Sequence, residues 1–403
     1  MIIANYPVGP VRGLFIVHSD LSSLEAKGVM PMFLERGERG FLDRVVTLHP
    51  LSNAQQTIHL APEQVIHELK VPKTRRFRPY SWLVLGLHLL KAVRFARRLV
   101  RFEELSFVRS QDPFFAGLIG YLATFGTSVP FCISVHADYD MQEKISAGTA
   151  APRIFGSYNL SNRLQNFLLR RADLVLGISE YMCRYAERHG ADPRKVRTFR
   201  HLIDIRSFEV PALSTVVERL DLPKDRRIIG VVSRLTEEKF IYDYVDLAQG
   251  LRARRNDFLI AIGGLGDQRE PLEQKIKKLG LENVVRLLGP LSKDQVRALR
   301  QQSFINMALL DGASLIEACS AARPVIAYAT EWHSELVEHN ATGILVPERN
   351  IEALALAVES LLDDPLRAEK LGRAAKHKVD SIFGEEKVLW ERRKIYRELV
   401  GLV

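Results

Sequence analysis

The sequence has few cysteines and no long apolar run. Its three cysteines, Cys132, Cys183 and Cys319, lie far apart in apolar contexts, which argues against a disulfide framework. No CxxC or Cys/His spacing suggests zinc, so no metal site is expected. The chain begins MIIANYPVGPVRG, without a basic segment followed by a long apolar core, so we expect no signal peptide. These absences favour a protein of the reducing cytoplasm.

Two motif classes are also missing. The sequence contains no RNP, KH or zinc-finger pattern and no aromatic platform between basic residues, so nucleic acid is not an expected partner. The segment AIGGLGDQ (261–268) is not a GxGxxG string with a downstream acid. A Rossmann-type dehydrogenase is therefore disfavoured.

The chain is large and of ordinary composition. At 403 residues, two domains are expected rather than one. Its hydrophobic fraction of 47% and charged fraction of 26% are typical of a globular protein with a large core.

The net charge of +9 is unevenly distributed, with a basic segment at 73–101. The apolar part of this segment, 82–90, is too short to span a bilayer. Helical spacing places basic residues on one face (Lys91, Arg94, Arg98, Arg101) and an apolar stripe beside them (Leu85, Leu89, Val93, Ala96, Val100). This pattern predicts a helix that lies on an anionic membrane surface. The alternative is an ordinary core-facing helix with a solvated basic side.

Short β-branched runs alternate with helical periodicity throughout, which predicts an α/β fold with parallel sheets. The expected strands are 13–19, 43–49, 105–110, 130–136 and 173–179 in the first half, and 227–233, 257–263, 284–289, 303–308, 324–328 and 343–346 in the second. A helix is expected near 113–127, and the tail from Ile351 reads as helical. The segment 202–216 is the expected linker.

We therefore predict two doubly wound Rossmann-like domains, 1–205 and 206–384, with a last helix, 385–403, that packs back on the first. In such sheets functional residues follow the carboxyl ends of the strands, and two facing domains would share a central cleft.

Two cations follow the strand 227–233. Arg234 and Lys239 stand five residues apart around a strand-to-helix turn, where an Arg fork and a Lys point charge can hold a diphosphate. The alternative is a pair of solvated charges beside Glu237 and Glu238.

The most informative stretch is DGASLIEACSAARPVI (311–326). Asp311 and Gly312 can cap a short helix, and the amides of Ala313, Ser314 and Leu315 would then face an anion at its N-terminus. Glu317 lies one turn inside, where a carboxylate can accept two hydrogen bonds from a ribose diol. A solvated mid-helix glutamate is the plainer alternative.

Further candidates follow other strands. Gly264 and Gly266 would allow the backbone to approach a ligand closely, and the turn at Gly289, before Leu291, could line a nucleobase.

In the first half, the segment SVHADYD (134–140) ends a strand with His136. Asp138 follows two residues later, which positions these side chains for polar contact with a substrate. His18 and Ser19 follow the first strand and are candidate acceptor contacts. A core histidine bonded to backbone is the alternative for His136.

Several of these segments resemble the retaining GT-B glycosyltransferases of family 4. SRLTEEK (233–239) is similar to the family's G-R-L-x-x-E-K, and 258–296 to its I-x-G-x-G segment and the strand and turn after it. SLIEACSAARPVIAYATEWHSELVEHNATGILVP (314–347) is similar to its L-L-E-A-M-A through T-G-x-L-V-P segment. The first-half strings DPFFAGLIGYLA, PFCISVHADYD and RRADLVLGISEYMCRYAERHGADPRKV fit the acceptor domain. The resemblance covers most of 105–400 in order.

The resemblance implies a role for each site residue. Arg234 and Lys239 would hold the nucleotide diphosphate, Gly312 to Leu315 would present amides to the phosphate and donor sugar, and Glu317 matches the second glutamate of the E-x7-E motif, which binds the ribose. His136 matches a histidine near the reacting centre. Such enzymes need no metal.

Three positions depart from the family pattern. Leu309 stands where the first glutamate of E-x7-E is expected, with Asp311 two residues on, and Phe240 stands where a glycine is usual. The loop after the first strand lacks the usual paired glycines.

The predicted function is transfer of a sugar from a nucleotide-diphosphate donor to a glycan or lipid-linked acceptor in cell-surface polysaccharide synthesis, at the cytoplasmic membrane face. One alternative is a nucleotide-sugar epimerase of the same fold. The other, prompted by Leu309, is a non-catalytic sugar-nucleotide-binding or scaffold protein.

Overall fold

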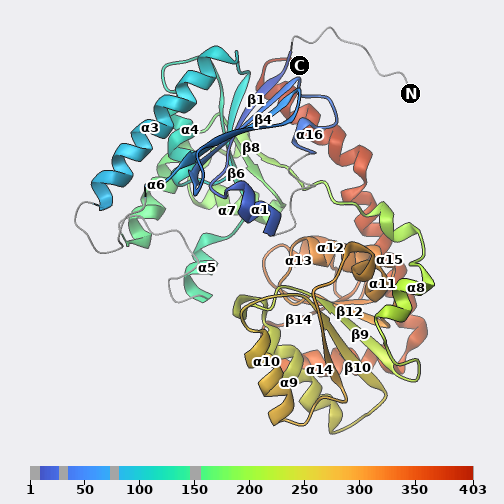
Figure 1. The fold of residues 1–403 in the computed structure, drawn as a ribbon. Helices are drawn as coiled ribbons and strands as arrows, with labels where there is room; N and C mark the ends of the chain where they lie inside the picture. Colours follow the sequence, from blue (N-terminus) through green and yellow to red (C-terminus); the bar gives the residue numbers. More distant parts are fainter. Residues whose placement is uncertain (1–9, 27–34, 73–80, 146–155, 403) are drawn as a thin grey trace, which may run out of the picture. The chain divides into compact units, whose positions relative to one another are not determined.

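The computed structural model describes residues 10–26, 35–72, 81–145 and 156–402, and it contains two compact units (Figure 1). Unit 1 comprises Met1–Leu202 with Val388–Val403, and unit 2 comprises Ile203–Lys387. The chain therefore returns to unit 1 within its last helix.

Unit 1 is built on an eight-stranded sheet in the order β3-β4-β2-β1-β5-β6-β7-β8. All neighbouring strands are parallel except β3 and β4, which form an antiparallel pair at one edge. The strands are β1 (Arg12–Ile16), β2 (Arg44–Ser52), β3 (Gln56–Ala61), β4 (Gln64–Lys70), β5 (Phe107–Ser110), β6 (Phe131–Val135), β7 (Leu174–Gly177) and β8 (Val196–Thr198).

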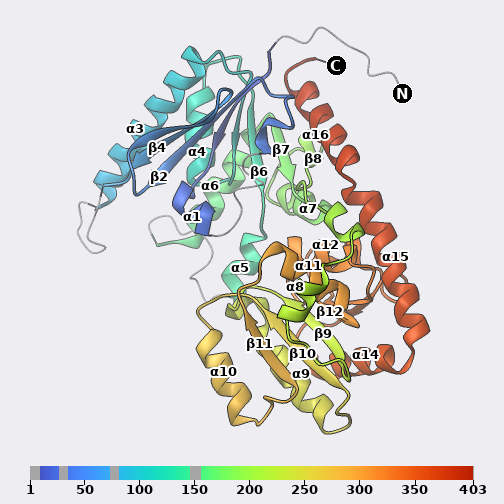
Figure 2. The same cartoon turned by 45° about the vertical axis from the view of Figure 1, so that its right-hand side comes forward.

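Helices cover both faces of this sheet because its strands alternate two apolar sets. Leu14, Ile16 and Val108 pack with α3 and α4 on one face, whereas Phe15 and Phe107 pack with α16 on the other. Figure 2 shows α3 and α4 lying next to each other against the sheet. The helices of this unit are α1 (Leu21–Ala26), η1 (Glu35–Gly37), α3 (Ser81–Phe102), α4 (Phe115–Thr124), α5 (Tyr139–Ile145), α6 (Tyr158–Arg171), α7 (Glu180–Arg188), η2 (Pro193–Lys195) and α16 (Glu385–Leu399).

Unit 2 has a six-stranded, all-parallel sheet in the order β11-β10-β9-β12-β13-β14. This is the doubly wound order in which β9 and β12 flank the point where the winding reverses. The strands are β9 (Arg227–Val232), β10 (Phe258–Gly263), β11 (Val285–Gly289), β12 (Ile305–Met307), β13 (Val325–Tyr328) and β14 (Ile344–Val346).

The core of unit 2 also lies on both faces of its sheet. Ile229, Ile260 and Ile305 pack against α9, α10 and α14, whereas Ile228 and Leu259 pack against α8 and α11. The helices are η3 (Arg206–Glu209), α8 (Ser214–Arg219), η4 (Glu237–Lys239), α9 (Ile241–Arg252), α10 (Arg269–Lys278), α11 (Lys293–Gln302), α12 (Ala313–Ser320), α13 (His333–Leu336), α14 (Ile351–Asp363) and α15 (Pro365–Phe383).

The predicted fold class, two Rossmann-like parallel-sheet domains, is confirmed. Each predicted strand is present, in most cases one or two residues shorter than its apolar run. The sequence did not predict β3, β4 and β8. The predicted linker holds η3 and the start of α8, and the Gln301 side-chain amide donates to the backbone oxygens of Phe208 and Val210.

The interpretation of the 73–101 segment needs a correction, and its first eight residues lie outside the described part of the chain. In α3 the predicted apolar stripe faces the core: Val93, Ala96 and Val100 are buried and Leu89 is partly buried there. That stripe is therefore not a membrane face. Instead, Leu83, Leu87 and Leu90 are exposed by 63%, 60% and 51%. In the described residues, α3 and every other helix fall short of the length and apolarity needed to cross a bilayer.

Candidate functional site

The predicted donor-site residues follow the two strands at the switch point of unit 2. The segment after β9 carries Arg234 and Lys239, and the segment after the adjacent β12 carries Asp311 and the start of α12. The fold thus brings together residues that are more than seventy positions apart in the sequence. Ligands of doubly wound sheets bind at such a point.

The Lys239 side chain reaches from the segment after β9 to the segment after β12. Its Nζ donates to the backbone oxygen of Leu310, 2.8 Å away, which directs the ammonium toward the start of α12. Arg234 is 66% exposed, and its Nη2 lies 3.4 Å from Glu238 Oε1. An exposed pair of this kind contributes little to stability, so the guanidinium can exchange Glu238 for a ligand at small cost.

Asp311 does not cap α12 as predicted. The N-cap position is Gly312 and no side chain caps the helix, while the Asp311 carboxylate is buried and its Oδ1 accepts from Ser233 Oγ at 3.1 Å. Burial raises the pKa of Asp311, against the lowering effect of the nearby Lys239 and Arg300 charges. The carboxyl group therefore links the two segments through Oδ1, whereas its Oδ2 has no hydrogen-bond partner among the described residues.

The start of α12 keeps some of its amides available. Leu315 N–H bonds to the Gly312 oxygen at 3.2 Å, so its amide is already used, contrary to expectation. For Ala313 and Ser314 no such backbone bond is formed within the described chain. Gly312 and Ala313 are exposed, which leaves the N-terminus of the helix open to an anion.

Arg300 supports this helix and was not predicted. It is fully buried, and its Nη2 donates to the side chain and the backbone oxygen of Ser314, the latter at 3.2 Å. Its Nε and Nη1 have no hydrogen-bond partner within the described chain. In the sequence, the signal that could have identified Arg300 is its charge on the apolar face of the helix 293–302.

Glu317 is half-buried on α12. Burial raises the pKa of its carboxyl, and the positive charge of Arg300 opposes this shift. Leu309, by contrast, is a core residue with no exposed surface, and its backbone amide donates to Tyr244 at 3.2 Å. The position of the first glutamate is thus structural in this chain.

The glycines after β10 allow close packing of the protein's own backbone. Gly264 has φ +151°, and a Cβ there would lie 1.8 Å from the Ser233 oxygen; a Cβ on Gly266 would lie 2.0 Å from the Leu235 oxygen. Leu291 covers Gly263, and Gly289 accepts a backbone bond from Gly264 at 2.8 Å. These glycines let the segment after β9 and the segment after β10 lie against each other, which fixes the backbone beside Arg234.

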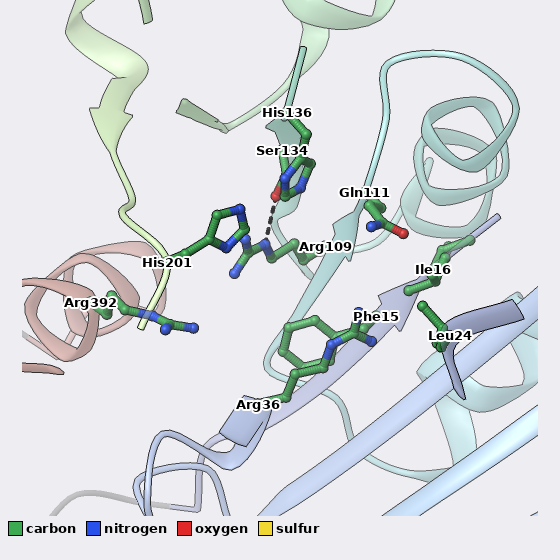
Figure 3. Close-up of a pocket in the computed structure, with 11 residues that line it drawn as sticks. Phe15, Ile16, Leu24, Arg36, Arg109, Gln111, Ser134, His136, His201 and Arg392 are labelled. Carbon is green, nitrogen blue, oxygen red and sulfur yellow. Dashed lines mark hydrogen bonds between the residues drawn. The ribbon is translucent and has the colours of Figure 1, made fainter. Parts of the chain in front are cut away.

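Unit 1 has a cavity of about 290 Å³ at its own switch point, between β1 and β5 (Figure 3). Its lining is Phe15, Ile16, Val17, Leu24, Arg36, Arg109, Gln111, Ser134, His136, His201 and Arg392. Only His136 in this list was predicted to be a site residue. Arg109 could have been noticed as a charge inside an otherwise apolar strand, whereas Arg36 and Arg392 come from segments without a recognisable motif.

His136 is the first residue after β6, as predicted, and it faces the cavity with His201 beside it. Their rings stack with centroids 5.4 Å apart. Burial lowers the pKa of His136 well below its usual range, and the nearby His201 and Arg109 reinforce the effect; burial and Arg392 lower the pKa of His201 to about 4. Both imidazoles are therefore neutral at physiological pH, and each has one ring nitrogen that donates a hydrogen bond and one that accepts.

The other predicted acceptor-side residues lie differently. His18 is exposed, with Nδ1 3.2 Å from Asp112 Oδ2, and Ser19 is half-buried beside it. Asp138 does not line the cavity: its oxygens accept from the Met141 amide at 2.9 Å and the Tyr181 hydroxyl at 2.6 Å. Asp138 therefore positions α5 and α7. Among the described residues, no group of three or more His, Cys, Asp or Glu side chains is arranged to hold a metal ion.

Two family models match the chain in succession. A glycosyl transferase 4-like domain matches residues 37–200, and the glycosyl transferases group 1 model matches 215–378. Together they account for most of both units.

Similar proteins are glycosyltransferases. An alpha-D-kanosaminyltransferase of Streptomyces kanamyceticus is 31% identical over 38% of this chain and 40% of its own length. A putative colanic acid biosynthesis glycosyltransferase of Escherichia coli is 28% identical over 59% and 57%. The matches thus span about half the length of these relatives. The crystal structure of Anabaena HepE in complex with UDP superposes with a TM-score of 0.73 at 18% identity, over 97% of this chain and 100% of the other. The chain therefore belongs to the family 4-like glycosyltransferases of the GT-B fold.

Proposed function

We propose that this protein transfers a sugar from a nucleotide-diphosphate donor to a hydroxyl of a glycan or lipid-linked acceptor, with retention of anomeric configuration. The observation that carries the proposal is the set at the switch point of unit 2, where two cations, a free helix N-terminus and Glu317 follow adjacent strands. The structural neighbour with UDP bound and the relative named for colanic acid biosynthesis support it.

In this proposal each group has a task. Arg234 and Lys239 bind the diphosphate and offset the charge that develops on it as the bond between the sugar C1 and the phosphate oxygen breaks. The α12 amides bind phosphate oxygens, and Glu317 accepts from the ribose hydroxyls. The acceptor oxygen forms the new bond to C1, and its proton leaves with the diphosphate. His136, neutral and beside the unit 1 cavity, binds substrate hydroxyls. Side chains and the helix end replace a metal ion.

The acceptor side of the proposal includes a membrane. The outward face of α3 carries Leu83, Leu87 and Leu90, followed along the same helix by the exposed cations Arg94, Arg98 and Arg101. Exposed leucines can enter the headgroup region while arginines bind anionic lipids. A lipid-linked acceptor would then be reached from the cytoplasmic face.

Thermal stabilisation by nucleotides tests the donor site. UDP, GDP and ADP are each added to the full chain with EDTA present, because a ligand that binds only the folded state raises the melting temperature. We expect one of them to stabilise the protein, and Arg234→Ala to abolish the shift. Arg373→Ala is the matched control, since Arg373 is 68% exposed in a similar pair with Glu369. No shift with any nucleotide would favour the scaffold alternative, whereas turnover of a donor without an acceptor to a new nucleotide-sugar would favour the epimerase.

A further inference from the structure

Arg300 is a buried charge to which the proposed function gives no task. It lies on α11 with no exposed surface, and its Nε and Nη1 have no hydrogen-bond partner among the described residues. It also forms no ion pair within the described part of the chain. Burying a guanidinium is costly, and replacing buried charges with well-packed apolar side chains often leaves stability unchanged or raises it. Packing alone therefore does not explain an arginine at this position.

Arg300 joins the end of β9 to the first turn of α12. Its Nη2 donates to the Ser314 backbone oxygen at 3.2 Å, to the Ser314 hydroxyl, and to the Val232 oxygen at 3.5 Å. The Ser314 hydroxyl in turn donates to the Val232 oxygen. Val232 is the last residue of β9, and Arg234 follows two positions later. One guanidinium therefore holds the start of the helix against the strand that leads to the predicted diphosphate contacts.

The same guanidinium places a positive charge behind the N-terminus of α12. Ser314 is the second residue of that helix, and its amide, like that of Ala313, forms no backbone hydrogen bond within the described chain. The positive end of a helix attracts an anion, and a buried charge is screened much less than a surface charge. A phosphate at the start of α12 would therefore be attracted by Arg300 as well as by the amides.

Arg300 also acts on Glu317, in the next turn of α12. Burial raises the pKa of the Glu317 carboxyl, and the positive charge of Arg300 is the largest influence in the opposite direction. Asp311 raises that pKa further, and Lys293 lowers it. Glu317 itself has no hydrogen bond or ion pair among the described residues. The charged form of Glu317, which would accept the ribose hydroxyls, is thus favoured mainly by the guanidinium on the neighbouring helix.

We propose that Arg300 is a positioning residue of the donor site, which fixes the start of α12 through Ser314 and directs its charge at the phosphate and ribose contacts of that helix. This role rests on the proposed glycosyltransferase function. Arg300 does not touch the donor, because its side chain is fully buried, and it acts through Ser314 and through its field on Glu317. Its replacement should therefore lower donor affinity without removing any group that contacts the donor.

Titration calorimetry on the full chain tests this role. UDP, GDP and ADP are measured first on the unmodified chain, and the one that binds most tightly is then compared with inorganic diphosphate. We expect Arg300→Met to weaken both that nucleotide and inorganic diphosphate by about tenfold or more, because the helix start loses its anchor and a nearby charge. Arg297→Met is the matched control on the same helix: Arg297 bonds to Asp294 and to the Ser207 oxygen, so both affinities should stay unchanged.

The pH dependence of binding separates this role from a purely structural one. Without the Arg300 charge, the Glu317 carboxyl is protonated at a higher pH. The ratio of nucleotide to diphosphate affinity should therefore fall more between about pH 8 and about pH 6 in Arg300→Met than in the unmodified chain. Inorganic diphosphate lacks a ribose, so this ratio isolates the Glu317 contact. Arg300→Lys retains the charge and should restore the unmodified pH profile, and adding Glu317→Gln to Arg300→Met should remove the difference.

A second variant retains the buried charge and removes the link to the strand. In Ser314→Ala the hydroxyl that bonds to Val232 is lost, so diphosphate affinity should fall while the pH profile stays that of the unmodified chain. An Arg300→Met variant that melts normally and binds both probes as tightly as the unmodified chain would overturn the role. If Arg300→Met does not fold, unchanged diphosphate affinity in Ser314→Ala would overturn it. Failure of the unmodified chain to bind any of the three nucleotides would instead overturn the proposed function, and this role with it.

Discussion

The two units assemble the charged groups at their switch points differently. In unit 2 short segments after two adjacent strands hold them: Lys239 bonds to Leu310, Asp311 to Ser233, and Arg234 lies beside Glu238. In unit 1 the cavity gathers Arg36, Arg109 and Arg392 from η1, β5 and α16, and the buried Glu38 accepts from Arg392 Nη2. Unit 2 thus positions its charges with local segments, whereas unit 1 positions them through tertiary contacts between distant parts of the chain.

The largest effect should come from Lys239. Replacing it with alanine removes a charge that stabilises the leaving diphosphate, and loss of one such group costs about 10²- to 10³-fold in kcat. Transfer from a radiolabelled donor sugar measures the rate. Lys275→Ala is the control, because Lys275 is a lysine of the same unit that lies away from β9 and β12, on α10, where it pairs with Asp246. Turnover within twofold of the unmodified chain would remove Lys239 from the chemistry.

A smaller loss should follow substitution of Glu317. In Glu317→Ala the ribose loses a charged acceptor, and hydrogen bonds to charged groups are worth about 1.5–3 kcal/mol, or about 10- to 100-fold in donor affinity. Glu317→Gln retains one acceptor and should lose less. Because burial raises the pKa of Glu317, removing its charge should not lower the melting temperature. Competition with a fluorescent nucleotide measures affinity, and equal affinities in all three proteins would contradict the ribose contact.

The sequence predicted unit 2 better than unit 1, and the reason is local. Most unit 2 strands are buried apolar runs bounded by turns, Arg234 and Lys239 directly follow such a run, and Glu317 lies on the short helix after another. Phe240 shows why its family pattern has glycine there: it has φ +54°, a left-handed conformation that costs about 1–2 kcal/mol for a side chain. Burial of the ring against Tyr328 offsets this cost.

The unit 1 cavity could not be predicted because its residues are assembled by tertiary contacts. Arg36 and Arg392 are separated by most of the chain, and neither follows a strand. The antiparallel strands β3 and β4 were missed, and β3 is an edge strand with no fully buried residue. Asp311 was misassigned as a cap because a sequence signal for capping cannot reveal that Ser233 accommodates the carboxylate instead.

Acid should destabilise both units, because each contains a buried histidine that is neutral in the folded state. His49 packs beside Glu68 in unit 1, and His333 bonds to Tyr328 and Asp311 in unit 2. Burial lowers the pKa of both from 6.5 to about 4. For both histidines the pKa in the folded state lies below the pKa in the unfolded state. The free energy of unfolding is therefore highest above pH 6.5 and decreases as the pH falls toward 4.

Urea unfolding across that pH range measures the effect. Each pKa unit corresponds to about 1.4 kcal/mol, so either histidine contributes a loss of about 3 kcal/mol. His333→Asn should make the free energy of unfolding of unit 2 less dependent on pH. His377→Asn, at an exposed position, should leave that dependence unchanged. An identical pH profile for His333→Asn and the unmodified chain would contradict the assignment.

The smallest effect should be seen at the membrane. Converting Leu83, Leu87 and Leu90 to serine removes exposed apolar surface from α3, and we expect about tenfold weaker binding to vesicles rich in anionic lipid. Converting Arg94, Arg98 and Arg101 to glutamine should weaken binding by about 1 kcal/mol per charge and remove its salt dependence. Flotation with lipid vesicles measures both. The control is serine at Leu356 and Leu366, two exposed leucines of unit 2. If that control loses as much binding as the α3 variants, the apolar contact is nonspecific and unit 1 has no membrane face of its own.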